Sequence, residues 1–211
     1  MLKNLQKGFT LLELLIVITI LAILTLVVVL FINPVEMLKK ARDVQRMSDM
    51  AVLRTAIVLY LQDRSTNTLG AANCASSASA VAAATSTWQW VSIPANTLGY
   101  ASTTVTTTNY TKNDGTGWVP VNFASVASSS SPPIAKLPID PINTFTSGNA
   151  TSTAYYYRYA CLTNNTFEID ATLESEAYVT DDPKASKDGG NLTYRYEVGT
   201  NLNILPAGVL P

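Results

Sequence analysis

The sequence of 211 residues has no histidine and only two cysteines, Cys74 and Cys161. Without histidine it lacks the commonest general base of enzymes. The two cysteines form no C-x-x-C motif, which disfavours a redox or zinc site. It also has no phosphate-binding G-x-x-x-x-G-K-[ST] sequence and no G-x-S-x-G nucleophile elbow. We therefore predict that the protein is not an enzyme.

Charged residues are also scarce. They make up 14% of the chain, and the formal net charge is −1. A chain without a basic excess offers little to the phosphates of nucleic acids, so we expect no nucleic-acid partner. Between Ser65 and Ala135 only Lys112 and Asp114 are charged. Because weakly charged surfaces tend to associate, we expect this central stretch to pack against other subunits or to carry sugars.

The sequence does contain a long apolar run near its N-terminus. A short basic leader, residues 1–8, ends in Gly8, and the run extends from Phe9 to Ile32 with Glu13 as its one charged residue. A bilayer core needs roughly 20 helical residues, so we predict a transmembrane helix over residues 9–32. A carboxylate inside such a run is costly unless it finds a partner, and this marks Glu13 as a functional residue.

The position of the leader favours processing before the apolar run. A secretory signal would place a small-residue cleavage site after the run, and Asn33-Pro34-Val35-Glu36 offers none. Cleavage between Gly8 and Phe9 would leave the apolar helix on the mature chain with a free amine at Phe9. That amine could pair with Glu13 of the same helix, or with the carboxylate of a neighbouring chain.

These residues, from Lys7-Gly8-Phe9-Thr10-Leu11-Leu12-Glu13 to Ile18, resemble the processing motif of type IV pilins and of the pseudopilins of type II secretion. The resemblance implies that a prepilin peptidase cuts after Gly8 and methylates Phe9. It further implies that Glu13 is the carboxylate that guides assembly. The alternative is a plain signal anchor with an incidental glutamate.

A second helix is predicted over residues 33–64, continuing into a head domain of residues 65–211. Pro34 should kink the chain between the two helices. One face of the second helix is apolar and is expected to cover the core. It comprises Met37, Ala41, Val44, Ala51, Val52 and Leu59.

The opposite side of this helix is predicted to be solvated or to face lipid headgroups, with local pairs Lys39–Asp43 and Arg46–Asp49. Farther along, Leu53 and Ile57 fall on that formerly polar side. A helix that is apolar all round should be buried all round, so we expect neighbouring subunits to cover part of it.

The C-terminal third is predicted to form a small antiparallel sheet, which makes the fold α+β. Candidate strands are residues 154–161, 167–173 and 192–198, and residues 163–166 form a hairpin turn between the first two. The alternation in 167–173 indicates one buried face, with Glu168 and Asp170 on the other. Together with Leu137-Pro-Ile-Asp140-Pro141 and Gly189-Gly190, this order resembles the heads of major pseudopilins and Gram-positive-type pilins. The resemblance implies the type IV pilin fold.

Two features of the head bear on covalent and metal chemistry. A cytoplasmic basic leader would place the head outside the membrane, where disulfides persist, so we predict a bond between Cys74 and Cys161. Two buried free thiols are the alternative. Asp181, Asp182 and Asp188 form an oxygen-rich loop that could hold calcium, as in some major pseudopilins, although acidic loops are more often merely solvated. No other cofactor is expected, and Glu174 and Glu176 are expected only to aid solubility.

Taken with the resemblance, the sequence predicts a structural subunit of a type IV pilus-like filament. The precursor would reside in the cytoplasmic membrane and the assembled filament outside the cell. Expected partners are copies of the same chain, the prepilin peptidase, the assembly platform and the membrane. The alternatives are a major pseudopilin, a minor or competence pilin that binds DNA, and a membrane-anchored binding module that never polymerises.

Overall fold

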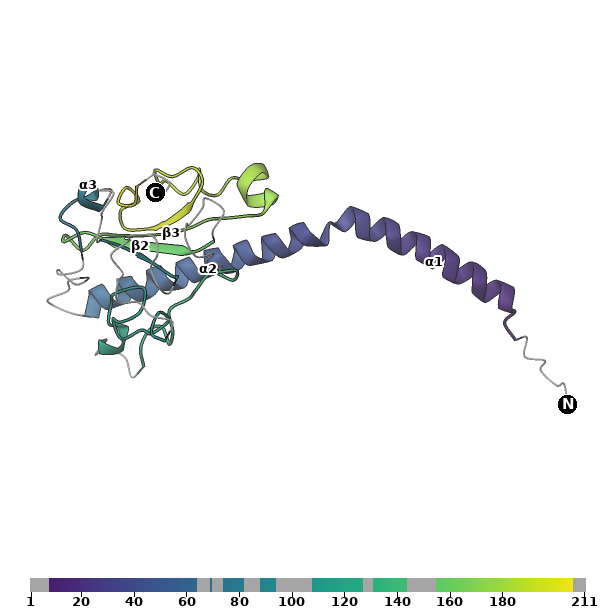
Figure 1. The fold of residues 1–211 in the computed structure, drawn as a ribbon, viewed down its shortest axis with the longest axis horizontal. Coiled ribbons are helices and arrows are strands. Elements are labelled where there is room, and N and C mark those ends of the chain that lie inside the picture. Colours follow the sequence, from purple (N-terminus) through teal and green to yellow (C-terminus); the bar gives the residue numbers. More distant parts are fainter. Residues whose placement is uncertain are drawn as a thin grey trace. The chain divides into compact units, whose positions relative to one another are not determined.

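The computed structural model describes residues 8–63, 69, 74–81, 88–93, 108–126, 131–143 and 155–206 (Figure 1). The chain divides into two compact units, residues 1–39 and 40–211. The first unit consists of helix α1 and the start of helix α2. The second contains the rest of α2 and a four-stranded sheet.

Helix α1, Leu11–Ile32, is apolar on every face, and each of its side chains that the structure describes is exposed. It ends at Asn33, whose backbone is left-handed with φ 44°. Helix α2, Pro34–Asp63, then begins at Pro34. Proline disfavours helical geometry in the residue before it but suits the first turn of a helix, because its missing N–H would be unpaired there. The helical conformation is therefore interrupted at Asn33, and a new helix begins at Pro34.

The head is built on an antiparallel sheet with strand order β1-β2-β3-β4. The strands are β1 Gln89–Val91, β2 Tyr157–Cys161, β3 Phe167–Ala171 and β4 Tyr196–Gly199. Three short helical turns complete the described elements: α3 Ala78–Val81, the 3-10 turn η1 Phe123–Ser125 and the π-helical turn η2 Ala177–Asp181. The fold is thus α+β, as predicted.

The predicted hairpin is present between β2 and β3, with Tyr159 opposite Ile169 in register. Its turn is closed by Asn165, which has φ 65°, and by the Asn164 Oδ1, which accepts bonds from Thr166. Strand β1 was not predicted. It has only three residues and lies in the central stretch, where small hydroxylated residues hide a strand signal.

The core lies between α2 and one face of the sheet (Figure 1). Met50, Leu53 and Ile57 of α2 pack with alternate residues of the strands, among them Tyr159 and Ile169. The central stretch also contributes buried side chains, namely Leu69, Trp90, Trp118, Val121 and Phe123. The described parts of this stretch therefore contribute to the core of the subunit, which its low charge did not predict. That the stretch also packs against other subunits or carries sugars stays a prediction.

The face of α2 that covers the core is not the one predicted. Val44, Val52 and Leu59 are 45–49% exposed, whereas Asp43 and Arg46 are completely buried. The apolar pattern alone misled the assignment, because the helix inserts charged side chains toward the head and leaves an apolar stripe uncovered. Arg46 is thus neither solvated nor facing lipid headgroups.

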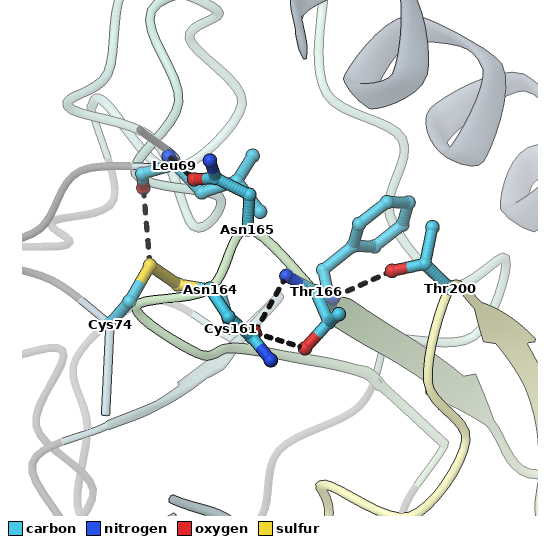
Figure 2. The surroundings of a disulfide bond; sticks show 8 residues. Leu69, Cys74, Cys161, Asn164, Asn165, Thr166 and Thr200 are labelled. Carbon is cyan, nitrogen blue, oxygen red and sulfur yellow. Dashed lines mark hydrogen bonds between the residues drawn. A yellow bond between two sulfur atoms is a disulfide. The ribbon is translucent and has the colours of Figure 1, made fainter. Parts of the chain in front are cut away.

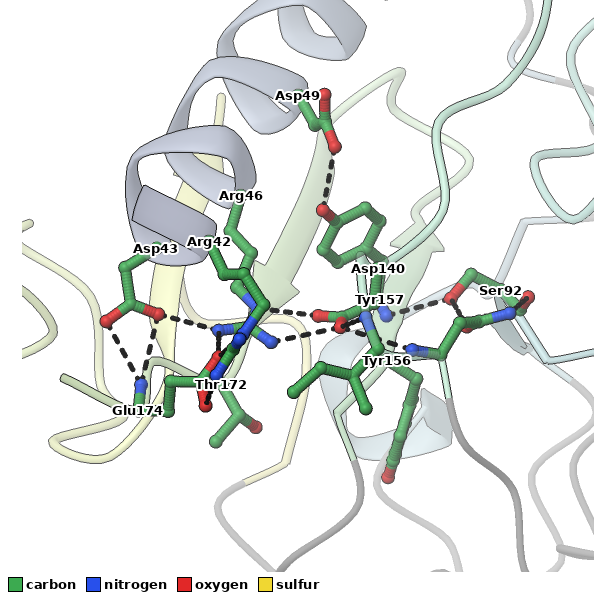
Figure 3. Close-up of polar contacts among 12 residues, drawn as sticks. Arg42, Asp43, Arg46, Asp49, Ser92, Asp140, Tyr156, Tyr157, Thr172 and Glu174 are labelled. Carbon is green, nitrogen blue, oxygen red and sulfur yellow. Dashed lines mark hydrogen bonds and ion pairs between the residues drawn. The ribbon is translucent and has the colours of Figure 1, made fainter. Parts of the chain in front are cut away.

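The buried charges form a cluster that we call the clamp, made of Arg42, Asp43, Arg46, Asp140 and Glu174 (Figure 3). Arg46 bonds Asp43, Asp140 and Glu174, each at 2.7 Å. The Asp43 carboxylate also accepts the backbone N–H of Glu174 at 3.1 Å. The clamp therefore joins α2 to two segments that lie about a hundred residues away in sequence.

The clamp corrects two sequence-based pairings. Asp43 pairs with Arg46 and not with Lys39, which lies 3.5 Å from Glu36. Asp49 accepts the hydroxyl of Tyr157 at 2.8 Å instead of pairing with Arg46 (Figure 3). Glu174 is bound by two arginines and so does more than aid solubility. Although burial opposes its ionisation, those arginines hold the pKa of Glu174 below its usual value.

The far face of the sheet is buried too, contrary to the prediction that β3 has one buried face. Asp170 on this face is fully buried and is bound by Arg195 at 2.7 Å and Arg158 at 2.9 Å. Burial opposes its ionisation, but the two guanidinium groups hold its pKa below the usual value. Nearby, Ile204 and Leu205 pack on Ala160 and Leu162 and cover the strands. The prediction from alternating polar residues was wrong here because ion pairs and the C-terminal segment cover the polar face.

Removing Arg46 should destabilise the head much more than removing Arg42. Arg46→Met leaves three carboxylates with fewer cations in a buried site, which typically costs about 3–5 kcal/mol of unfolding free energy. Arg42 pairs with Glu174 alone, and its side chain is 33% exposed, so Arg42→Met should cause a much smaller loss. Denaturant unfolding of both full-length variants in detergent measures the difference. Equal losses would show that the clamp does not depend on Arg46.

Candidate functional site

The predicted processing site lies at an open end of the first unit. Gly8 is exposed, and nothing lies within 4 Å of the position that a Cβ would take there. Phe9 is 89% exposed, and Thr10 has an extended backbone with φ −81° and ψ 151°. The peptide between Gly8 and Phe9 thus precedes the helix and is accessible to an enzyme. Its cleavage stays a prediction.

Glu13 is held at the start of α1 by a capping box with Thr10. The Thr10 Oγ1 accepts the backbone N–H of Glu13 at 3.2 Å, and the Glu13 Oε2 accepts the backbone N–H of Thr10 at 2.9 Å. The Thr10 hydroxyl also donates to the Glu13 Oε2 at 2.8 Å. These bonds satisfy donors that a helix start leaves unpaired. They also point the carboxylate toward the side of the chain where Phe9 lies.

The capping box has a consequence for the predicted partners of Glu13. A negative charge in the first turn is favoured by the helix dipole, and cleavage before Phe9 would create a positive amine one residue from Thr10. The geometry therefore suits a pairing between Glu13 and the Phe9 amine, within the chain or between chains. Thr10 was missed as a site residue, although the T-x-x-E pattern of a capping box could have revealed it.

The other polar side chains of α1 are satisfied locally. Thr19 donates its hydroxyl to the carbonyl of Ile16 at 2.8 Å, and Thr25 donates to Leu21 at 2.7 Å. Glu13 is the helix's only ionisable residue. In the part of the chain that the structure describes, Leu11–Val29 is the one helix long and apolar enough to cross a membrane.

Cys74 and Cys161 form a disulfide bond across a sequence separation of 87 residues (Figure 2). Cys161 ends β2, and both side chains are buried. The backbone N–H of Ala75 donates to the Cys161 carbonyl at 2.9 Å, so the segment after Cys74 lies against the sheet. A cross-link over so long a loop typically stabilises a domain by about 2–5 kcal/mol.

The acidic loop near Gly189-Gly190 is occupied by donors of the protein itself. Asp182 pairs with Lys184, and with Lys187 at 2.6 Å. Asp188 accepts the backbone N–H groups of Gly190 at 2.9 Å and Glu197 at 2.7 Å. Among the described residues, no three acidic, histidine or cysteine side chains are grouped so that they could hold a metal ion. Calcium in this loop stays an untested prediction.

Comparison with known proteins supports the reading of the N-terminus. The family model described as the prokaryotic N-terminal methylation motif matches residues 3–29. No curated protein and no solved structure matches the chain. The matched segment contains Gly8, Phe9, the capping box and most of α1. The chain therefore carries the class III signal peptide of type IV pilins and pseudopilins.

Proposed function

We propose that the protein is the structural subunit of a type IV pilus-like extracellular filament. The observation that carries the proposal is α1, a 22-residue apolar helix exposed on all sides, with Glu13 capped at its start. Such a helix requires an apolar environment along its whole length. The bilayer supplies it for the precursor, and the helices of other subunits supply it in a filament.

The physics of this exchange assigns a role to Glu13. Because lipid is as apolar as protein, hydrophobic burial does not drive a helix from the membrane into a filament. The assembly platform must supply the work. A buried pair between Glu13 and a Phe9 amine contributes register more than net stability, since desolvation offsets its attraction. We infer that this pair selects the correct axial position of each added subunit.

The exposed stripe of α2 supports contact between copies of the chain. Val52 and Leu59 border a groove of about 270 Å³ whose lining also includes Ala51, Thr55, Ala56 and Pro133. Small residues in such a groove allow another helix to approach closely. We infer that a second copy of the chain fills this groove, because Val52 and Leu59 expose apolar side chains there.

The main alternative is a major pseudopilin, which would form a short fibre within the cell envelope and serve secretion. A membrane-anchored module that does not polymerise is the alternative of another kind. Filament length and location separate the three. Shearing of native cells should release long filaments of a pilin, leave a pseudopilin in the envelope fraction, and leave an unpolymerised module in the membrane.

We expect the mature chain to begin with N-methyl-Phe9. Intact-mass and N-terminal peptide mass spectrometry of sheared material from the native host measures this terminus. Gly8→Val should block cleavage, because the peptidase would meet a stiff β-branched side chain at a position that is open in the wild-type protein. Asn4→Ala, elsewhere in the leader, serves as control and should be processed normally. An intact Met1 in the wild-type protein would contradict the proposal.

Glu13→Gln should reduce the filament yield roughly tenfold or more, since it removes the charge while keeping the size of the side chain. Cleavage after Gly8 should be unchanged, so the defect appears in assembly alone. Thr19→Val removes a polar group that bonds only its own helix, and it should assemble normally. Electron microscopy and immunoblots of the sheared and membrane fractions measure both steps. Normal filaments from Glu13→Gln would exclude the register role.

Val52→Glu should also reduce the filament yield roughly tenfold or more, because it would bury an unpaired charge between subunits. The thermal stability of the head should change little, since Val52 is 49% exposed in the single subunit. Arg54→Gln is a matched control, with the same change in net charge on another exposed side of α2. Equal yields from both variants would mean that the stripe makes no contact in the filament.

A further inference from the structure

Two buried glutamates lie side by side on the far face of the sheet. Glu168 belongs to β3 and Glu197 to β4, and they are 0% and 1% exposed. Glu168 lies opposite Gly199 in the ladder, so Glu197 is its diagonal neighbour on the same face. Two carboxylates in contact away from water cannot both be ionised without a large cost. The pair therefore holds a proton.

The Glu168 Oε1, unpaired among the described residues, assigns this proton to Glu168, although the two backbone N–H groups at its Oε2 oppose protonation. The Glu197 Oε2 accepts the backbone N–H of Leu192 at 2.8 Å, as an ionised carboxylate would. The Glu168 Oε1 is buried and accepts no bond from any residue that the structure describes. Protonated, this oxygen becomes a donor to Glu197, and both groups are satisfied. The chain passes so close to the Glu197 carboxyl that a Cβ at Gly190 would collide with it.

The acidic groups beside the pair favour keeping the proton, whereas three cations that line the same cavity as Glu197 oppose it. These cations are Arg54, Lys184 and Lys187. Asp170 follows on β3, and it is the residue that binds both Arg158 and Arg195. Asp188 accepts the backbone N–H of Glu197 on the other side. Each carboxylate opposes a further negative charge. Burial above all, and then the contact with Glu197, raises the pKa of Glu168 from 4.5 to about 9.

Glu168 is also the polar anchor of the C-terminal strap, which we define as residues 200–206. The Glu168 Oε2 accepts the backbone N–H groups of Ile204 at 2.6 Å and Leu205 at 2.9 Å. The two side chains are 1% exposed, and they pack in one apolar cluster on Ala75, Val81, Ala160 and Leu162. Loss of this anchor would free residues 204–206 of the strap from the sheet, while Thr200 stays bonded to Phe167.

We propose that the C-terminal strap is a proton-controlled latch, closed while Glu168 and Glu197 share a proton and released when the pair loses it. Opening exposes both carboxyls to water, where a glutamate has its ordinary pKa near 4.5. The closed state thus binds one proton more than the open state between about pH 5 and pH 9. Over this range each pH unit should raise the open-to-closed ratio about tenfold.

Release of the strap would uncover an apolar surface beside the disulfide. Ala75 and Leu162, which form a bridge with each other, follow Cys74 and Cys161 directly in the chain. This face is covered most firmly in acid and becomes progressively more available toward alkaline pH. The latch does not depend on whether the subunit forms a filament.

Hydrogen exchange of the full-length protein in detergent micelles tests the latch. After correction for the intrinsic pH dependence of exchange, protection of the Ile204 and Leu205 amides should fall about tenfold per pH unit between pH 5 and pH 9. Glu168→Gln retains an acceptor for both amides but cannot lose a proton, so its protection should be independent of pH. Glu197→Gln removes the neighbouring carboxyl but leaves Glu168 buried, so its slope should end at a lower pH than in the wild-type protein. This variant keeps the test available if Glu168→Gln folds poorly.

Asp181→Asn is the control, because Asp181 is exposed in η2 and should leave the wild-type slope unchanged. Flat protection of the wild-type amides across this range would overturn the proposal. So would a wild-type slope in Glu168→Gln, or an unchanged upper limit of the slope in Glu197→Gln, because the titrating group would then lie elsewhere. A slope that disappears in Glu168→Gln, ends at a lower pH in Glu197→Gln and persists in Asp181→Asn would establish the latch.

Discussion

A helix that is apolar on every face has no stable place in water, and this constraint governs the whole chain. Each described residue of α1 is exposed in the single subunit, so the helix must reside in lipid or among other helices. The basic leader, the predicted cleavage site after Gly8 and the capped Glu13 all lie at its start. A membrane precursor and an assembled product are two solutions to the same solvation problem.

In the proposed function the head has the opposite requirement, since it must remain folded while α1 passes from the membrane into the filament. The clamp around Arg46 fixes α2 to the segments that carry Asp140 and Glu174. The disulfide fixes a second segment to the end of β2. Because these links lie within the second unit, the head keeps its own core whatever surrounds α1. A fold secured in this way suits a subunit that is moved as a body.

The sequence predicts the elements of this fold better than it predicts their faces. Helix α1 follows from the length of the apolar run, and the β2–β3 hairpin follows from the alternation of its strands and the residues of its turn. The structure confirms both elements. The buried side of α2 does not follow, because the residues that bury it include Asp43 and Arg46. Their partners Asp140 and Glu174 are distant in sequence, and no local sequence pattern predicts such a cluster.

The same reasoning explains why β3 was wrongly predicted to have one face exposed to solvent. Glu168 and Asp170 alternate with apolar residues, yet both are fully buried. Asp170 is tolerated there because Arg158 and Arg195 neutralise it, whereas Glu168 pairs with no cation among the described residues and burial raises its pKa. Two acidic residues on one strand thus remain buried by different means. The ion pair is insensitive to pH near neutrality, whereas the proposed shared proton makes the strap that Glu168 anchors respond to pH.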